Sequence, residues 1–448
     1  MARNHRNDGN FSEAACCQLH IAALMAEYLR LKDDTSEGSS RHSWGADALA
    51  SVSCNIPVDE RGLKLDAGVH ETQYTEQQLL EQLEACAESL ELSERYELLG
   101  SLYRLILPIH ERRRDYEALA ACYGRLRDSC LRVAEVARTG KRLLGRYYRV
   151  AFFGRAYFEE EDGAEYVYKE PKLTGLGEIT ERLHKLYSDK FGVEVVRMVT
   201  DSSQVDEASL DSRLAYIQVT HLTPHWEPGQ LPEHYSEFEV NHDVRSFMYE
   251  APFTRDGRTR GTPMDQWKRR TILTTQYAFP YVLKRIPVTG KRSIELSPIE
   301  VALDEMRSRV SELEDAVSSR PLDAKKLQLR LQGSVCVQVN AGPLAYATVF
   351  LDPALSLQYP EDKVEELKDV FREFVRICNE ALRVNDRLIT TDQQEYQNAL
   401  RDNFQKMCEQ LSQLFNESLW PLPDDCGQRD SLALFSAISG AQYNSSSA

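Results

Sequence analysis

The hydrophobic pattern of this 448-residue chain changes its period twice, and this limits the folds open to it. Residues 1–145 carry apolar side chains at helical spacing, residues 146–290 alternate with the period of two typical of strands, and residues 291–420 return to helical spacing. A chain of this length is also too long for a single core. We therefore predict a mainly α protein with a β lobe, built as a helical lobe, a sheet lobe and a helical bundle.

The first zone is predicted to be an irregular helical-repeat array. Helical periodicity occurs at Phe11–Leu29, Thr75–Cys86, Ser93–Ile109 and Asp115–Arg138. We expect Pro108 and the charged turn at 111–114 to separate the last two helices. A strict repeat of about 34 residues, which tetratricopeptide arrays show, does not occur.

The second zone is predicted to form two antiparallel sheets packed as a sandwich-like layer. Its β-branched and aromatic segments are Tyr147–Phe153, Glu165–Lys169, Ala215–Thr220, Ser246–Glu250 and Arg270–Thr275. One helical segment, Glu178–Phe191, interrupts these strands.

The third zone is predicted to be a four-helix bundle. Ser297 fits an N-cap, Pro298 fits the first helical position, and Glu300 completes a capping box. Helical periodicity continues to Ser318 and returns at Asp323–Gln332, Leu344–Phe350, Lys363–Val384 and Asp392–Asn416. Residues 421–448 are small and polar, and we expect a disordered tail there.

A valine-rich insert, Leu331–Pro343, lies between two helical stretches of this bundle. Gly333, Gly342 and Pro343 oppose helix, and three valines alternate with polar or small residues. The insert can be a connector whose valines pack into the core. It can also be an exposed apolar loop that enters another molecule.

Motifs for covalent chemistry are missing from the sequence. No phosphate-binding loop, GxGxxG, GxSxG or HExxH pattern occurs, so we expect no cofactor and no bound metal. The net charge of −16 argues against nucleic acid as a partner. The ten cysteines form no CxxC pair, and the polar start lacks the features of a signal peptide, so we expect a cytoplasmic chain with free thiols.

A basic strip lies between residues 251 and 292, where only Asp256 and Asp265 oppose ten basic residues. Its members are Arg255, Arg258, Arg260, Lys268, Arg269, Arg270, Lys284, Arg285, Lys291 and Arg292. The strip can be a solvated sheet face, a surface for an acidic protein, or a weak contact for an anionic membrane.

Several ordered motifs resemble one family. They are Tyr168–Pro171, Phe247–Tyr249, Lys268–Thr275, Ala278–Tyr281 and Ser297–Ala302. Together they resemble the second DOCK homology region, also called the DOCKER domain, and Val337–Ala347 resembles the Zizimin subfamily. The likeness extends from about Phe11 to Glu417, and several long motifs in the same order make chance agreement implausible.

The resemblance implies a guanine nucleotide exchange factor for a Rho-family GTPase, acting without covalent chemistry. The first lobe would form a homodimer, while the second and third would grip the GTPase. A Cdc-type GTPase is the expected partner, with Rac as the alternative. A non-catalytic GTPase-binding scaffold and a lipid-surface adaptor are the competing functions.

The resemblance also implies a nucleotide-sensor valine in the loop Gly333–Pro343, which would enter the GTPase and exclude magnesium. Val339 is the candidate sensor, with Val335 and Val337 as alternatives because the alignment within so short a loop is ambiguous. The remaining loop residues expected to contact the GTPase are Asn340, Ala341, Gly342 and Pro343.

Overall fold

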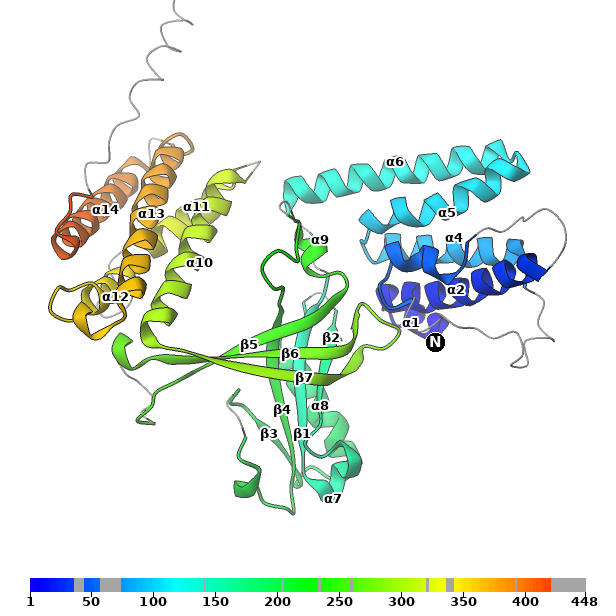
Figure 1. Ribbon diagram of the computed structural model, residues 1–448, viewed down its shortest axis with the longest axis horizontal. Coiled ribbons are helices and arrows are strands. Elements are labelled where there is room, and N and C mark those ends of the chain that lie inside the picture. The colour runs from blue at the N-terminus through cyan, green and yellow to red at the C-terminus, as the bar shows by residue number, and fades with distance from the viewer. Residues whose placement is uncertain are drawn as a thin grey trace, which may run out of the picture. The chain divides into compact units, whose positions relative to one another are not determined.

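The chain folds into two compact units (Figure 1). The first comprises Met1–Ala251 and Arg269–Ile294, and the second comprises Pro252–Lys268 and Glu295–Ala448. The structure, a computed structural model, describes residues 1–35, 44–56, 74–140, 142, 144–171, 173–202, 205–232, 235–257, 262–319, 322–335, 342–390 and 393–419. The predicted disordered tail lies outside these residues.

Helices stacked side by side form the first part of the first unit (Figure 1). They are α1 (Ala2–Asn7), α2 (Phe11–Thr35), α4 (Glu76–Leu92), α5 (Glu97–Arg113) and α6 (Tyr116–Thr139), with the 3-10 turn η1 (Ala46–Ser51). Helix α2 packs on α4, α4 on α5, and α5 on α6. Their apolar faces form one core that includes Leu19, Leu83 and Leu99.

Helix α5 runs through Pro108 and ends at Arg113, so the proline itself does not separate α5 from α6 as expected. The break comes at Arg114, which adopts a left-handed φ of 54°. Pro108 removes one backbone donor, but Ile109 and His110 beyond it are buried. Packing of this last turn outweighs the local preference of proline.

The second part of the first unit is a closed ring of six antiparallel strands, so the prediction of two separate sheets was wrong. The strands are β1 (Arg146–Phe153), β2 (Glu165–Glu170), β4 (Ala215–Pro224), β5 (Val244–Phe253), β6 (Trp267–Phe279) and β7 (Arg285–Leu296). Their order is β1-β2-β7-β6-β5-β4, and β1 pairs with β4 from Tyr147↔Leu222 to Phe153↔Tyr216 to close the ring. Three strands cross the boundary between the two units. The last residues of β5, the first residues of β6 and the last residues of β7 belong to the second unit.

Strand β1 explains the closure, because both of its faces are buried. Tyr148, Val150 and Phe152 pack under α8 (Leu176–Phe191), whereas Tyr147 packs against Phe247 from the opposite face. A strand that is apolar on both faces is stable only in the middle of a sheet, with a neighbour on each side. Sequence alternation identified the strand and could not identify both neighbours.

Short elements complete this unit. They are α7 (Arg155–Phe158), η3 (Glu159–Glu161), β3 (Val196–Val199), η4 (Glu207–Ser209) and α9 (Glu237–Val240). Strand β3 pairs in parallel with β4 outside the ring. Strand β3 was not predicted because it has only four residues, and β7 was not predicted because Pro287 and Gly290 weaken its strand pattern.

The second unit is a helical bundle. Its helices are α10 (Pro298–Ser318), α11 (Ala324–Val335), α12 (Pro343–Phe350), α13 (Glu361–Asp386) and α14 (Gln394–Phe415), with the turns η5 (Pro263–Asp265) and η6 (Ser356–Gln358). The capping box predicted at Ser297 and Glu300 is confirmed. Helices α11 and α12 both pack on α10 and α14, so they occupy one position in the bundle as two pieces of an interrupted element.

Candidate functional site

The interruption between α11 and α12 is the candidate functional site. Helix α11 ends at Val335 and α12 begins at Pro343. The intervening Val337, Val339, Asn340 and Ala341, all predicted to contact the partner, lie outside the described residues. The structure therefore defines the two ends from which this segment starts and returns.

The first end is helical for longer than predicted, since Gly333, Ser334 and Val335 belong to α11. A glycine inside a helix costs only about 1 kcal/mol relative to alanine, and burial of Leu331 and Val335 opposes that cost. The Arg309 side chain of α10 also donates from Nη1 to the Gly333 carbonyl oxygen, 3.3 Å away. This bond serves a carbonyl near the helix end that lacks an intrahelical partner.

The second end is fixed by backbone geometry. Gly342 has a φ of 102° and caps α12, a conformation that favours glycine. Pro343 occupies the first turn of α12, where its missing donor costs nothing, and is buried. The sequence features that suggested a loop here thus define the start of a helix.

A polar contact holds the same end against α10. The Tyr346 hydroxyl donates to Glu305 Oε2 at 2.6 Å. Burial, followed by the neighbouring Glu305 carboxylate, raises the pKa of Tyr346, so the phenol stays protonated as a donor. Lys268 Nζ lies 3.8 Å from Glu305 Oε1. This contact could not be predicted from the sequence, because Glu305 and Tyr346 are 41 positions apart and no spacing pattern links them.

Five of the ten residues of the basic strip form ion pairs with carboxylates from other parts of the chain. Its ion pairs are Lys268–Glu305, Arg270–Glu250, Arg285–Glu161, Lys291–Glu165 and Arg292–Glu227. Arg255 stacks on the Trp267 ring, with its guanidinium carbon 3.7 Å from the ring centre. Arg258 and Arg260 lie outside the described residues. Five paired cations leave a much weaker positive field than the sequence count suggested.

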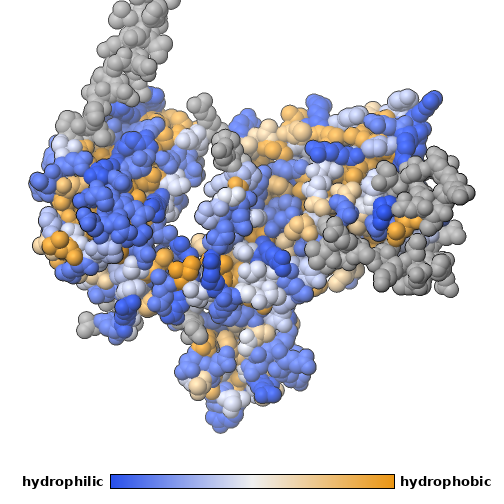
Figure 2. Space-filling view, in the orientation of Figure 1, coloured by the Kyte–Doolittle hydropathy of each residue, from blue (hydrophilic) through white to orange (hydrophobic). Residues whose placement is uncertain are grey.

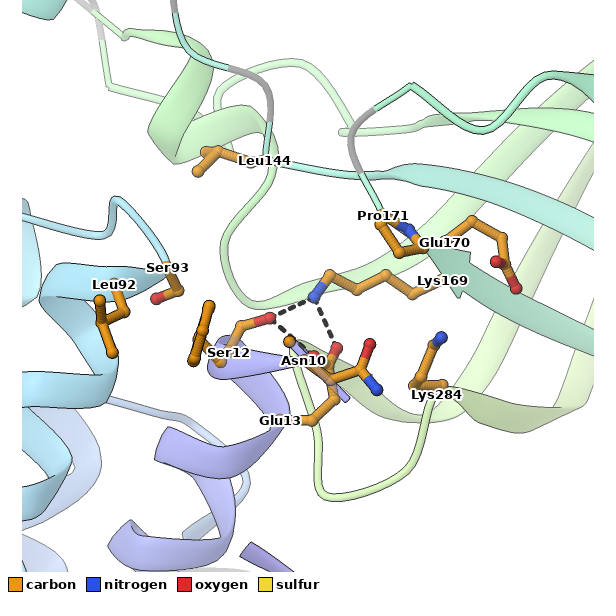
Figure 3. A pocket seen from close by; sticks show the side chains of 12 residues that line it. Asn10, Ser12, Glu13, Leu92, Ser93, Leu144, Lys169, Glu170, Pro171 and Lys284 are labelled. Carbon is orange, nitrogen blue, oxygen red and sulfur yellow. Dashed lines mark hydrogen bonds and ion pairs between the residues drawn. The ribbon is translucent and has the colours of Figure 1, made fainter. Parts of the chain in front are cut away.

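A small cavity in the first unit lies between α2 and β2 (Figure 3). Lys169 of β2 points to Ser12 and Glu13 of α2, with Nζ 2.6 Å from Glu13 Oε1. Burial favours the neutral acid, but Lys169 outweighs it and lowers the pKa of Glu13. The buried charges thus neutralise each other, which indicates a structural link between α2 and β2.

The remaining chemistry is sparse. In the part of the chain that the structure describes, no group of three or more His, Cys, Asp or Glu side chains could hold a metal ion. The eight described cysteines are free, and six of them are buried. Within the described ranges, no helix is long and apolar enough to cross a bilayer.

Comparison with known proteins matches three family models along the chain. They are described as DHR-2, Lobe A, over residues 1–135; DHR-2, Lobe B, over 202–278; and DHR-2, Lobe C, over 312–414. A helical array, a strand ring and a bundle with an interrupted helix therefore define a DHR-2 region. The chain belongs to this region of the dedicator of cytokinesis (DOCK) family.

Three relatives illustrate the match. The chain is 49% identical over 433 residues to dedicator of cytokinesis protein 9 of Mus musculus, covering 94% of this chain and 21% of that protein. It is 47% identical over 444 residues to protein 11 of Danio rerio, covering 98% and 21%. It is 38% identical over 431 residues to protein 7 of Homo sapiens, covering 94% and 20%. The chain thus spans about a fifth of the length of these relatives.

Proposed function

We propose that this chain is a guanine nucleotide exchange factor that releases GDP from a Rho-family GTPase. The observation that carries the proposal is the interrupted bundle helix, whose two ends, α11 up to Val335 and α12 from Pro343, are each held by a hydrogen bond to α10. Membership of the DHR-2 family supports it. Exchange needs no acid, base or nucleophile from this chain, because no covalent bond is made or broken.

The proposed mechanism is exclusion of magnesium by a valine side chain. Magnesium in a GTPase is held by oxygen ligands in near-octahedral geometry and neutralises the nucleotide phosphates. An isopropyl group offers no ligand and displaces the ion, so the phosphate charge loses its compensation and the nucleotide leaves. Val339 is our candidate for this side chain, and Val337 is the alternative.

Val335 is less suited to this role. It is the last residue of α11 and only 1% exposed, in contact with the bundle core. Using it as the sensor would require removing it from that core, at a cost of about 1.5–3 kcal/mol for a fully buried aliphatic side chain. Its burial therefore favours a sensor further along the segment.

The GTPase preference is proposed from sequence similarity. Identity to relatives 9 and 11 is 49% and 47%, against 38% to relative 7. This agrees with the Zizimin-like sequence Val337–Ala347, for which we propose a Cdc-type GTPase as the preferred partner and Rac as a weaker one. We also propose that the chain acts in the cytoplasm and forms a homodimer through its first lobe. The boundaries that we propose between the three lobes lie near residues 145 and 290.

Two alternative functions can be distinguished from nucleotide exchange by experiment. A scaffold of the same fold would bind the GTPase without lowering its affinity for nucleotide. A lipid-surface adaptor would use the basic strip, but its five ion pairs reduce the charge available to anionic lipid. Such an adaptor would bind anionic liposomes in a salt-sensitive manner.

Release of fluorescent GDP from purified Cdc-type and Rac GTPases tests the proposal. We expect catalytic amounts of this chain to accelerate release from the Cdc-type GTPase. The accompanying binding assay should show tighter association with the nucleotide-free GTPase, because exchange factor and nucleotide weaken each other's binding by the same factor. Binding without acceleration on either GTPase would leave the scaffold function in its place.

A further inference from the structure

We propose that Glu305 and Arg309 of α10, together with Tyr346 of α12, are positioning residues. They would hold the two ends of the exchange segment, which is the stretch of chain between Val335 of α11 and Pro343 of α12. The proposal rests on the proposed function and concerns residues outside the segment itself. None of the three would touch nucleotide. Their role would be to fix where the segment starts and returns, which decides where its apolar side chain is presented.

One face of α10 reaches both ends. Glu305 and Arg309 are four residues apart and therefore lie one above the other on the same face of the helix. Arg309 donates to the Gly333 carbonyl near the end of α11, and Glu305 accepts the Tyr346 hydroxyl in the first turns of α12. The two contacts connect the same short stretch of one helix to both sides of the interruption.

The surrounding packing makes this face a firm support. Leu303, Met306 and Val310 of α10 are buried in the same core as Val335 and Tyr346. Tyr346 is itself 9% exposed, so its hydroxyl is the polar tip of a packed ring. The hydrogen bond to Glu305 also leaves one carboxylate oxygen facing Lys268 Nζ at 3.8 Å. Lys268, the first residue of the motif Lys268–Thr275, thus contacts the same carboxylate that accepts the Tyr346 hydroxyl.

The physical reason for such supports is the geometric tolerance of insertion. A side chain that must replace a metal ion tolerates little displacement, and a misplacement of about 1 Å costs on the order of 100-fold in rate. Loosening one end should therefore slow exchange while leaving the wider GTPase interface intact.

The main test is Tyr346→Phe, which keeps the packed ring and removes the hydroxyl. Initial rates of fluorescent GDP release are measured over a range of GDP-loaded Cdc-type GTPase concentrations. We expect kcat to fall by about tenfold, with KM changed less than about twofold. Arg309→Lys is the second variant. Lysine keeps the positive charge but lacks the planar guanidinium that donates to the Gly333 carbonyl oxygen. Arg307→Gln is the matched control: Arg307 is exposed on the same helix and pairs with Glu366 of α13.

A double-mutant cycle with Val339→Ala separates positioning from general destabilisation. If Tyr346 acts through the segment, Tyr346→Phe should slow exchange little further once Val339 is truncated, because coupled residues are non-additive. Unchanged kcat in both single variants, or full multiplication of the effects in the double variant, overturns the positioning role alone. An inactive wild-type chain overturns the exchange function and this role together.

Discussion

Val335, the first valine of the valine-rich insert, is buried, and its burial makes it less suited to act on a partner than Val337 or Val339. Val335 is 1% exposed in the bundle core, whereas Val337 and Val339 follow the end of α11. Sequence alternation alone treats the three residues alike. The burial of Val335 could not be predicted from the sequence, because Gly333, two residues earlier, suggested that the helix had already ended.

Val339→Ala is predicted to lower the rate of GDP release at least about tenfold while leaving GTPase binding within about twofold. Alanine lacks the two methyl groups that would occupy the magnesium position, but it changes little of a wide interface. The measurement is stopped-flow GDP release paired with a binding assay on the nucleotide-free GTPase. Val337→Ala is the matched control, and an effect confined to that variant would move the sensor to Val337.

Glu165 on β2 makes a pH-dependent contribution to stability. Its side chain accepts two hydrogen bonds from Arg149, at 2.8 Å each, and one from Lys291 at 2.7 Å. Burial opposes ionisation, yet these two cations outweigh it and lower the pKa of Glu165 to about 2. A carboxyl whose pKa is lower in the folded chain stabilises the fold above its unfolded pKa, near 4.5, and loses that contribution as the pH falls toward 2.

Glu165→Gln is therefore predicted to lower the free energy of unfolding by about 2–4 kcal/mol at pH 7, since it leaves the buried Arg149 without its carboxylate. The difference from wild type should shrink between pH 4.5 and about 2. Urea unfolding at several pH values measures it. Glu160→Gln, at an exposed position of η3, is the control; a gap that stays constant across this range would contradict the assignment.

At the scale of elements, local signals predicted most helices, whereas contacts distant in sequence decided the exceptions. The capping box at Ser297 and Glu300 lies within four residues and was readable from the sequence. Strand β7 contains Pro287 and Gly290 and is held by pairing with β2, so its own residues gave little indication. The contact between Glu305 and Tyr346 also depends on packing of two helices that sequence spacing cannot place together.

Pro108 offers a test of packing against local preference in α5. The proline is exposed, and the helix continues beyond it through buried Ile109 and His110. Pro108→Ala should restore one helical hydrogen bond and raise the free energy of unfolding by about 1–2 kcal/mol. Thermal unfolding provides the measurement, with Arg104→Ala, at an exposed position of the same helix, as the control. A lower melting temperature would mean that the proline ring makes stabilising contacts of its own.

The Lys169–Glu13 pair joins α2 to β2 and should be sensitive to loss of either charge. Lys169→Met leaves the Glu13 carboxylate buried without its cation, which is expected to cost about 3–5 kcal/mol. Adding Glu13→Gln should recover part of this loss, since the unpaired charge is then gone. Equilibrium unfolding of both variants measures the effect, and a fully additive double variant would show that the two residues are not coupled.

At the scale of the whole molecule, two features could not be predicted from sequence patterns. Closure of the ring depends on pairing of β1 with β4, which are more than 60 residues apart. The second compact unit also includes Pro252–Lys268, a segment from within the sheet zone. Turn η5 of that segment packs on α10 and α12. Composition placed these residues with the strands, and only their contacts assign them to the bundle.

The proposed dimer would use an exposed apolar face of α6 in the first unit. Tyr116, Tyr123 and Leu131 of α6 are 73%, 55% and 56% exposed. They are seven and eight residues apart, about two turns each, and so lie on one side of the helix. Hydrophobic surface follows part of α6 in Figure 2. Large apolar side chains gathered on one face are typical of protein interfaces.

Tyr123→Glu combined with Leu131→Glu is predicted to convert a dimer of this chain into a monomer, because both substitutions place charge where apolar area would be buried. Light scattering after gel filtration measures the mass, and GDP release per chain should stay within about twofold because α6 is distinct from the segment after α11. Leu186→Glu, on α8 and 59% exposed, is the matched control and should leave the mass unchanged. A dimer that survives the double substitution would assign association to another surface, whereas a wild-type monomer would remove dimerisation from the properties of this chain.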